Sequence, residues 1–458
     1  MNSRLLLGFT AVAALLALAV PRAKSNPKPP APSVKPLAYT PRPANSITFT
    51  KDIAPIVFAN CASCHRAGEV GPFALTSYAE AAKRAKTLAN VVGKRTMPPW
   101  KAAPGPAYQD ECRLSDEQIG LIQQWAAEGA VEGNAADLPA LPQFPSGWRN
   151  GEPDLVLEMP QDFRVPAEGR DIYQNFVIPT GFTEDKWLST VEIHPGNRRV
   201  VHHVLVHLDV SGKARELDAK DPAPGYRGGL GFPSAGQIGG WAPGNVARRA
   251  PDGIGTMMPK DSDVVIQVHY NLSGKPETDR TKVGLYFAKG PVDKRARLTP
   301  LAGRINIPAG DADYHVTASI PVPADVTLRS VMPHMHLLGR EMRVFATLPD
   351  GQELPLVHVP EWDFNWQMGY AFKEPIKLPR GSKVSLAARY DNSADNPRNP
   401  NHPPKAVRWG EQTTDEMCLA YLNFTVNSES LTQGRVVPSA ADFKRKLGEA
   451  RKKSTTAN

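Results

Sequence analysis

The sequence has only four cysteines, and its first 193 residues contain a single histidine. Three of the four cysteines and one of the eleven histidines fall there, and two of those cysteines stand beside that histidine in Cys61-Ala62-Ser63-Cys64-His65. A structural zinc cluster needs further cysteine or histidine ligands near such a motif. A thiol-redox pair does not require the adjoining histidine. The lack of further ligands therefore disfavours a zinc cluster, and the presence of the adjoining histidine disfavours a thiol-redox pair.

The motif instead predicts a covalently attached haem c. Two thiols at this spacing reach the two vinyl groups of a haem, and the histidine that follows binds the iron. Between residues 66 and 187 the soft candidates for a sixth ligand are Met97, Met159 and Cys112. We predict Met97, because the two prolines after it stiffen its loop. An open or water-ligated iron is the alternative. Residues 48–133 resemble a short class I cytochrome c domain.

Acidic residues are absent from the first 46 residues, which hold six basic ones. Together with the basic tail this segment carries a net charge of about +10, so the part between them is about −2 and the overall +8 does not indicate a nucleic-acid surface. The apolar run over residues 5–19 is short for a membrane span. It predicts a secretory signal over residues 1–23, cleaved or retained as an anchor, and hence a periplasmic or secreted protein.

The rest of the sequence predicts a multidomain protein. A Pro-rich linker over 24–46 leads to a small all-α cytochrome c domain over 47–135, with helices expected near 52–60, 78–92 and 115–129. Short Val/Ile/Leu/Tyr runs then predict two antiparallel β-sandwich, jelly-roll-like domains over 150–298 and 299–435, before a basic tail over 436–458. The runs expected as strands cover residues 154–159, 200–210, 264–270, 282–287, 314–320, 330–348, 382–390 and 418–426.

The other ten histidines lie in the β part, and several of them form pairs. His202 and His203 are adjacent on one expected strand, and His269 lies on another. His334 and His336 are two residues apart, which places both imidazoles on one face of a strand. A thioether beside imidazoles favours copper, and Met417 offers one. Zinc in the histidine sites is a weaker alternative.

In this order the motifs resemble the copper type II, ascorbate-dependent monooxygenases, that is, peptidylglycine α-hydroxylating monooxygenase and dopamine β-monooxygenase. The resemblance covers residues 190–430, with Trp241-Ala242-Pro243 and Pro308-Ala309-Gly310 as further landmarks. It implies two copper ions, O₂-dependent hydroxylation of a C–H bond, a small-molecule or peptide substrate, and an ascorbate-like or protein reductant. It also implies an electron-accepting copper held by His202, His203 and His269, with Gln267 nearby, and an oxygen-activating copper held by His334, His336 and Met417.

The sequence departs from this family at several positions. Tyr421 matches a tyrosine that helps to hold the substrate carboxylate, but Met332 replaces the family arginine and Leu419 replaces a polar neighbour. A peptidyl-glycine substrate is therefore disfavoured. His207 has no family counterpart, and strand alternation places it on the same face as His203. It is expected to be either a surface or core histidine or an extra metal ligand. The histidines expected to be structural are His194, His315, His358 and His402.

The family's disulfides have no counterpart in this chain, because only Cys112 and Cys418 remain after haem attachment. A bridge between these two is one hypothesis. We predict an exported haem-coupled dicopper monooxygenase whose cytochrome passes electrons to the copper of His202, His203 and His269. The alternative is a non-enzymatic periplasmic electron-transfer or copper-binding protein. No nucleic-acid partner is expected. Contact with a membrane is expected only if the signal is an uncleaved anchor.

Overall fold

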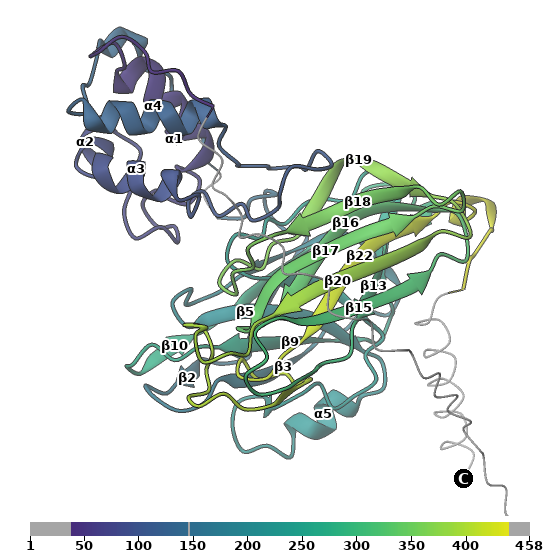
Figure 1. The fold of residues 1–458 in the computed structure, drawn as a ribbon. Helices are drawn as coiled ribbons and strands as arrows, with labels where there is room; N and C mark the ends of the chain where they lie inside the picture. Colours follow the sequence, from purple (N-terminus) through teal and green to yellow (C-terminus); the bar gives the residue numbers. More distant parts are fainter. Residues whose placement is uncertain (1–37, 145–146, 439–458) are drawn as a thin grey trace, which may run out of the picture.

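The computed structural model describes residues 38–144 and 147–438. A small helical region lies beside a larger part built of β-sheets (Figure 1). This confirms the expected fold class at the level of a mostly β protein with a small helical N-terminal region. The expected signal peptide and most of the basic tail lie outside the described residues. Within those residues, no helix is both long enough and apolar enough to cross a membrane.

The helical region surrounds a core that includes Phe49, Val57 and Trp125. Its last helix begins at a capping box, in which the Ser115 hydroxyl accepts the Gln118 N–H and the Gln118 side chain accepts the Ser115 N–H. The elements of this region are η1 (Phe49–Ile53), α1 (Ala54–Asn60), α2 (Tyr78–Ala82), α3 (Ala85–Gly93), α4 (Asp116–Ala127) and η2 (Ala135–Asp137).

The C-terminal end of the expected Pro-rich linker packs onto the helical region. The Tyr39 hydroxyl donates to the Gln124 side chain at 2.6 Å, and Arg42 pairs with Asp52 at 2.9 Å. A Cβ on Gly120 would lie 2.1 Å from the Tyr39 ring, so a glycine is needed there. Residues 38–46 form no helix or strand but pack against α4, where the Tyr39 ring lies beside Gly120.

Two five-stranded sheets share one hydrophobic core and are called here the first sheet pair. In one sheet the order is β1 (Leu155–Glu158), β11 (Lys282–Phe287), β4 (Lys186–His194), β8 (Ile254–Met258) and β12 (Lys294–Arg295). In the other it is β6 (Tyr226–Arg227), β3 (Ile172–Pro179), β9 (Asp263–Tyr270), β5 (Val201–Asp209) and β7 (Gly236–Trp241). Outside these sheets lie β2 (Phe163–Val165), β10 (Glu277–Asp279) and α5 (Lys213–Asp218).

Two four-stranded sheets share the largest hydrophobic core and form the second sheet pair. The first has the order β13 (Arg297–Ala302), β22 (Cys418–Val426), β16 (Val326–Met335) and β19 (Tyr370–Leu378). The second has the order β15 (Tyr314–Pro321), β20 (Lys383–Tyr390), β17 (Gly339–Thr347) and β18 (Glu353–Val359). The remaining elements are β14 (Asn306–Ile307), β21 (Val407–Arg408) and η3 (Leu431–Gln433).

The run expected as one strand over 330–348 is two strands. The chain leaves β16 after Met335 and enters β17, in the facing sheet, at Gly339. A Cβ at Gly339 would lie 2.8 Å from Met335 and 2.9 Å from Trp362, so only glycine allows this close crossing. The crossing places His334 and His336 at the end of the sheet pair.

The helical region is fixed to the second sheet pair by the loop that follows Met97. Trp100 and Tyr108 are buried in the core of that sheet pair, and the Tyr108 hydroxyl donates to the Leu356 carbonyl at 2.8 Å. The backbone of this loop also pairs with β19, through Gln109 N–H to Ala371 O at 2.8 Å. Figure 1 shows the helical region beside the end of the second sheet pair at which β19 is labelled.

Candidate metal centres

His202 and His203 reach one site although they are neighbours on β5. Successive residues of a regular strand point to opposite faces. The pairing of β5 with β9 has an irregularity between Val201 and His203, which leaves His202 as an extra residue and breaks the alternation. His203 pairs directly with His269 on β9. This β-bulge therefore brings three imidazoles together.

The Nδ1 atom of His203 lies 3.3 Å from the Nδ1 atoms of both His202 and His269. One ring nitrogen from each of the three lies within 4.8 Å of the others. His269 Nε2 lies 3.1 Å from Asp171 Oδ2, and a carboxylate accepts an N–H there, which leaves the Nδ1 lone pair facing the other two rings. This donor set suits copper or zinc.

The surroundings keep His202 and His203 uncharged and hold the His269 ring in place. Burial, with the other imidazoles nearby, lowers the pKa of His202 to about 3 and that of His203 well below its usual range. The Tyr173 ring stacks on His269 with centroids 4.2 Å apart. Although burial opposes it, hydrogen bonds from His269 and Thr413 lower the pKa of Asp171. Neutral imidazoles backed by a carboxylate are ready to bind a metal at neutral pH.

A second group forms where β16 ends and β22 begins. His334 Nδ1 lies 2.7 Å from the Gln367 side-chain oxygen, and His336 Nδ1 lies 3.1 Å from the Asp415 carbonyl. Both Nδ1 atoms donate to these oxygens, which leaves both Nε2 lone pairs free. Burial lowers the pKa of His334 to about 3 and that of His336 to about 4.

Glu416 joins the segments that carry this second group. Its Oε2 accepts the backbone N–H of His336 at 2.9 Å and that of Met417 at 3.0 Å, and its Oε1 accepts that of Leu338 at 2.8 Å. The carboxyl is fully buried, and burial raises its pKa to about 8 against the effect of these N–H groups. Glu416 therefore holds His336 and Met417 side by side.

Both groups face one cleft between the two sheet pairs, with a volume of about 590 Å³. The cleft is lined by His203 from the first group and by His334, His336 and Met417 from the second. Tyr421, Met332, Leu419, Trp241 and Gln267 also line it. The Phe364 ring separates the groups: its centroid lies 4.6 Å from that of His202 and 5.8 Å from that of His336.

The haem motif follows directly after α1. His65 Nδ1 lies 3.1 Å from the Phe73 carbonyl, so its N–H points there and Nε2 is free to bind iron. A Cβ on Gly71 would lie 2.6 Å from the Cys64 carbonyl and 2.8 Å from His65 Nδ1, so glycine is required beside the motif. Cys61 and Cys64 are free thiols. These residues fit a covalently bound haem.

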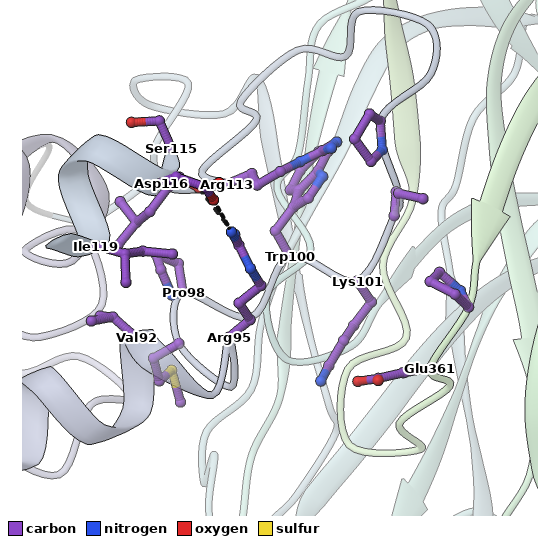
Figure 2. Close-up of a pocket in the computed structure, with 16 residues that line it drawn as sticks. Val92, Arg95, Pro98, Trp100, Lys101, Arg113, Ser115, Asp116, Ile119 and Glu361 are labelled. Carbon is purple, nitrogen blue, oxygen red and sulfur yellow. Dashed lines mark hydrogen bonds and ion pairs between the residues drawn. The ribbon is translucent and has the colours of Figure 1, made fainter. Parts of the chain in front are cut away.

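Met97 lines a cavity of about 460 Å³ between the helical region and the second sheet pair. In Figure 2 Val92 and Ile119 lie on its helical side, Glu361 lies on the sheet side, and a dashed line joins Arg95 to Asp116. The buried nitrogens Trp100 Nε1 and Arg113 Nε lack hydrogen-bond partners in the described residues. Met97 stays a prediction as the sixth iron ligand.

The remaining predicted residues are placed as follows. Gln267 donates to Asn175 at 3.0 Å and makes no hydrogen bond to a histidine of the first group in the described residues. The Cys112–Cys418 bridge is not formed, because both are free thiols. Cys418 is buried against Gly303. Burial, with Cys64 as a further cause, raises the pKa of the Cys112 thiol to about 11.

His207 is not solvent-exposed but lines the cleft on the same side as His203. Of the histidines expected to be structural, three pair with carboxylates: His194 with Glu192 at 2.9 Å, His315 with Asp313 at 3.3 Å and His358 with Glu341 at 2.8 Å.

Sequence reasoning missed the side chains that orient the imidazoles. Asp171, Gln367 and Phe364 stand 98, 33 and 162 positions from the histidines that they contact, in segments without a motif. Glu416 could have been noticed from its place beside Met417, because a carboxylate in an apolar strand entry needs a partner.

A search of curated proteins found no match. Similar solved structures include PNGase F, a glycosylasparaginase from Flavobacterium meningosepticum (11% identity, 60% of this chain, 96% of that chain, TM-score 0.23). They also include infectious bursal disease virus, Gx strain (9% identity, 68% of this chain, 93% of that chain, TM-score 0.15). Such low TM-scores carry no argument about this protein.

Two families match separate parts of the chain. Residues 50–120 match the family described as cytochrome C oxidase, cbb3-type, subunit III. Residues 305–437 match copper type II ascorbate-dependent monooxygenase, C-terminal domain, and contain the second group of ligands, His334, His336 and Met417. These two matches agree with the fusion that the sequence predicts, of an N-terminal cytochrome c-type domain with a copper type II ascorbate-dependent monooxygenase.

Proposed function

We propose that this protein is an exported, haem-coupled dicopper monooxygenase that hydroxylates a C–H bond with O₂. The observation that carries the proposal is the common cleft, which His203 of the three-histidine group lines together with His334, His336 and Met417 of the second group. The two sheet pairs are then the two jelly-roll-like β-sandwiches of this enzyme family. Two copper ions, one in each group, and one haem c on Cys61 and Cys64 complete the cofactors.

The reaction inserts one oxygen atom into a C–H bond and reduces the other to water, so each turnover consumes O₂, two electrons and two protons. Copper bound at the two groups would supply one-electron chemistry and the place of O₂ reduction, while haem c would relay electrons from an ascorbate-like or protein donor. Asp171 and Gln367 hold the imidazole tautomers that leave the ligand nitrogens unprotonated. Apolar walls such as Trp241 and Leu419 limit water at the reacting carbon.

A chain of ion pairs supports the coupling between the haem motif and the first group. Glu69, four residues after His65, accepts from Arg66 and from Arg198, each at 2.9 Å. Arg198 lies four residues before His202. The segment that carries the haem motif therefore touches the segment that leads to the first copper ligand, which supports electron delivery by a short route.

A Met417→Ala variant tests the proposal. The variant lacks the thioether of the second group but retains all histidines, so we expect it to lose O₂ consumption while its haem spectrum and haem reduction stay unchanged. Met332→Leu, which alters the same cleft without touching a ligand, is the matched control. If Met417→Ala and the wild type reoxidise reduced haem at the same rate under O₂, the protein is an electron carrier and the proposal is wrong.

A further inference from the structure

His207 is a buried histidine that the proposed reaction does not use. It is 8% exposed, and its Nδ1 atom lies 3.4 Å from the Ser234 hydroxyl. Its Nε2 atom is buried and has no hydrogen-bond partner in the described part of the chain. Leaving a buried polar atom without a partner costs free energy, so such an atom calls for an explanation.

The His207 side chain lies where two cavities meet. His207 and Tyr421 line the cleft that holds the metal ligands, and both also line a second cavity of about 520 Å³ that none of those ligands borders. The two cavities share further wall residues, among them Ile238 and Leu298. Together they form a path that leads from the metal ligands, past His207, into the second cavity. Each volume falls within the roughly 300 to 1,000 Å³ that is typical of small-molecule sites.

The path is mainly apolar, and the two arginines at its far end share one buried carboxylate. Leu205, Ile238 and Met332 line it beside the metal ligands. The arginines at its far end, Arg295 and Arg297, each lie 2.8 Å from the buried Glu429 carboxylate. Burial lowers the pKa of His207 to about 4, so this side chain is neutral at pH 7 and offers a hydrogen bond without a charge.

We propose that His207 is a specificity-determining residue, which hydrogen-bonds through Nε2 to a polar atom of an uncharged, largely apolar small-molecule substrate. The inference rests on the proposed function, because it takes the metal end of the path as the reacting end. The reacting carbon lies toward Met417, the polar atom lies at His207, and the rest of the molecule extends into the second cavity. A negative charge next to the metal ligands is disfavoured, because it would be buried beside Met332 in a cleft that no lysine or arginine of the described residues lines.

Three probes of similar shape test this assignment: 2-acetylnaphthalene, 2-ethylnaphthalene and 2-naphthoate. Their binding to the full-length, haem- and copper-loaded protein is measured by equilibrium dialysis, with the protein reduced and held under nitrogen so that no turnover occurs. We expect the ketone to bind about tenfold more tightly than the hydrocarbon, which is the effect of one hydrogen bond to a buried partner. We expect the carboxylate to bind most weakly.

Variants at residue 207 show whether this nitrogen is responsible. His207→Leu should remove the preference for the ketone while leaving binding of the hydrocarbon unchanged, which also reports that the variant is folded. His207→Gln should restore part of the preference, because its amide can still hydrogen-bond. His315→Leu, at a side chain that is 61% exposed, should behave as the wild type does.

The inference is overturned if the carboxylate binds best, if none of the probes binds, or if His207→Leu retains the wild-type preference for the ketone. Its failure is distinguishable from failure of the proposed function, because the dialysis involves no O₂. A ketone preference that depends on His207, found together with full O₂ consumption by Met417→Ala, would leave the binding assignment standing and remove the monooxygenase.

Discussion

The Phe364 ring stacks on the imidazole of His202, with ring centroids 4.6 Å apart and 20° between the planes. The same ring meets His336 edge-on at 5.8 Å. Phe364 comes from the loop between β18 and β19, so a side chain of the second sheet pair contacts a ligand of the first group. It is 7% exposed and fills the space between the two groups of ligands.

We expect Phe364→Leu to loosen the spacing of the two groups without removing a ligand. The smaller side chain cannot contact both imidazoles, so the distance distribution between two bound Cu(II) ions in pulsed EPR should broaden while the copper content stays the same. The free energy of unfolding should fall by about 1 kcal/mol. Phe345→Leu on β17 is the control, and an equal EPR change in both variants would argue against a spacing role for Phe364.

The Glu69–Arg198 contact should govern electron transfer from the haem. Glu69→Gln should slow haem reoxidation by about twofold to fivefold, because a partly exposed ion pair is worth up to about 1 kcal/mol. The wild-type rate should fall toward that of the variant as the salt concentration rises. Stopped-flow spectroscopy measures both effects. Arg199→Ala, which breaks the neighbouring pair with Glu277, should leave the rate unchanged.

Asp171→Asn should weaken copper binding at the first group by about 10-fold to 100-fold. An asparagine can present its N–H₂ to His269 Nε2, which moves the imidazole proton to Nδ1 and removes the lone pair that faces His203. Copper titration with competing chelator measures the loss, and the second group should titrate as in the wild type. Asp162→Asn, at a side chain that is 61% exposed, is the control; unchanged affinity in Asp171→Asn would rule out this tautomer argument.

Acid should destabilise the copper-free protein partly through His207. Its pKa is about 4 in the folded protein and about 6.5 in the unfolded chain, so only the unfolded chain takes up a proton between these values. The stability contribution is complete above pH 6.5 and is lost as the pH falls toward 4, with a slope of up to about 1.4 kcal/mol per pH unit. Urea unfolding at pH 6.5, 5.5 and 4.5 should show a shallower loss for His207→Gln than for the wild type, whereas His315→Gln should match the wild type.

Local patterns were sufficient to predict the elements whose signals lie within a few residues. The capping box at Ser115 predicted α4, and the strand β11 runs over the residues expected. The strand β3 was missed because Gln174 and Asn175 interrupt its apolar pattern, although both are buried in the structure. Their partners lie about 50 residues away, at Pro224 and Tyr226, so only the folded chain explains them.

The candidate site divides in the same way. The spacing of His334, His336 and the adjacent pair at His202 could be read from the sequence, and the structure brings each set together. The β-bulge at His202 could not be predicted, because it depends on how β5 pairs with β9. The cleft is lined by residues of both sheet pairs. Its apolar lining could not be predicted, because it depends on how the two sheet pairs pack together.

The anchoring of Trp100 and Tyr108 makes the cytochrome part inseparable from the rest of the molecule. A truncation that begins after residue 135 would remove two aromatic side chains from the core of the second sheet pair, together with the hydrogen bond to Leu356. Such a fragment is therefore unsuitable for studying the candidate copper sites without haem. Full-length protein in which Cys61 and Cys64 are replaced by serine is suitable, because it keeps these aromatic side chains. The same anchoring argues against a haem carrier that swings between an outside donor and the copper sites. If the proposed function holds, electron donors would have to come to a cytochrome that stays in place.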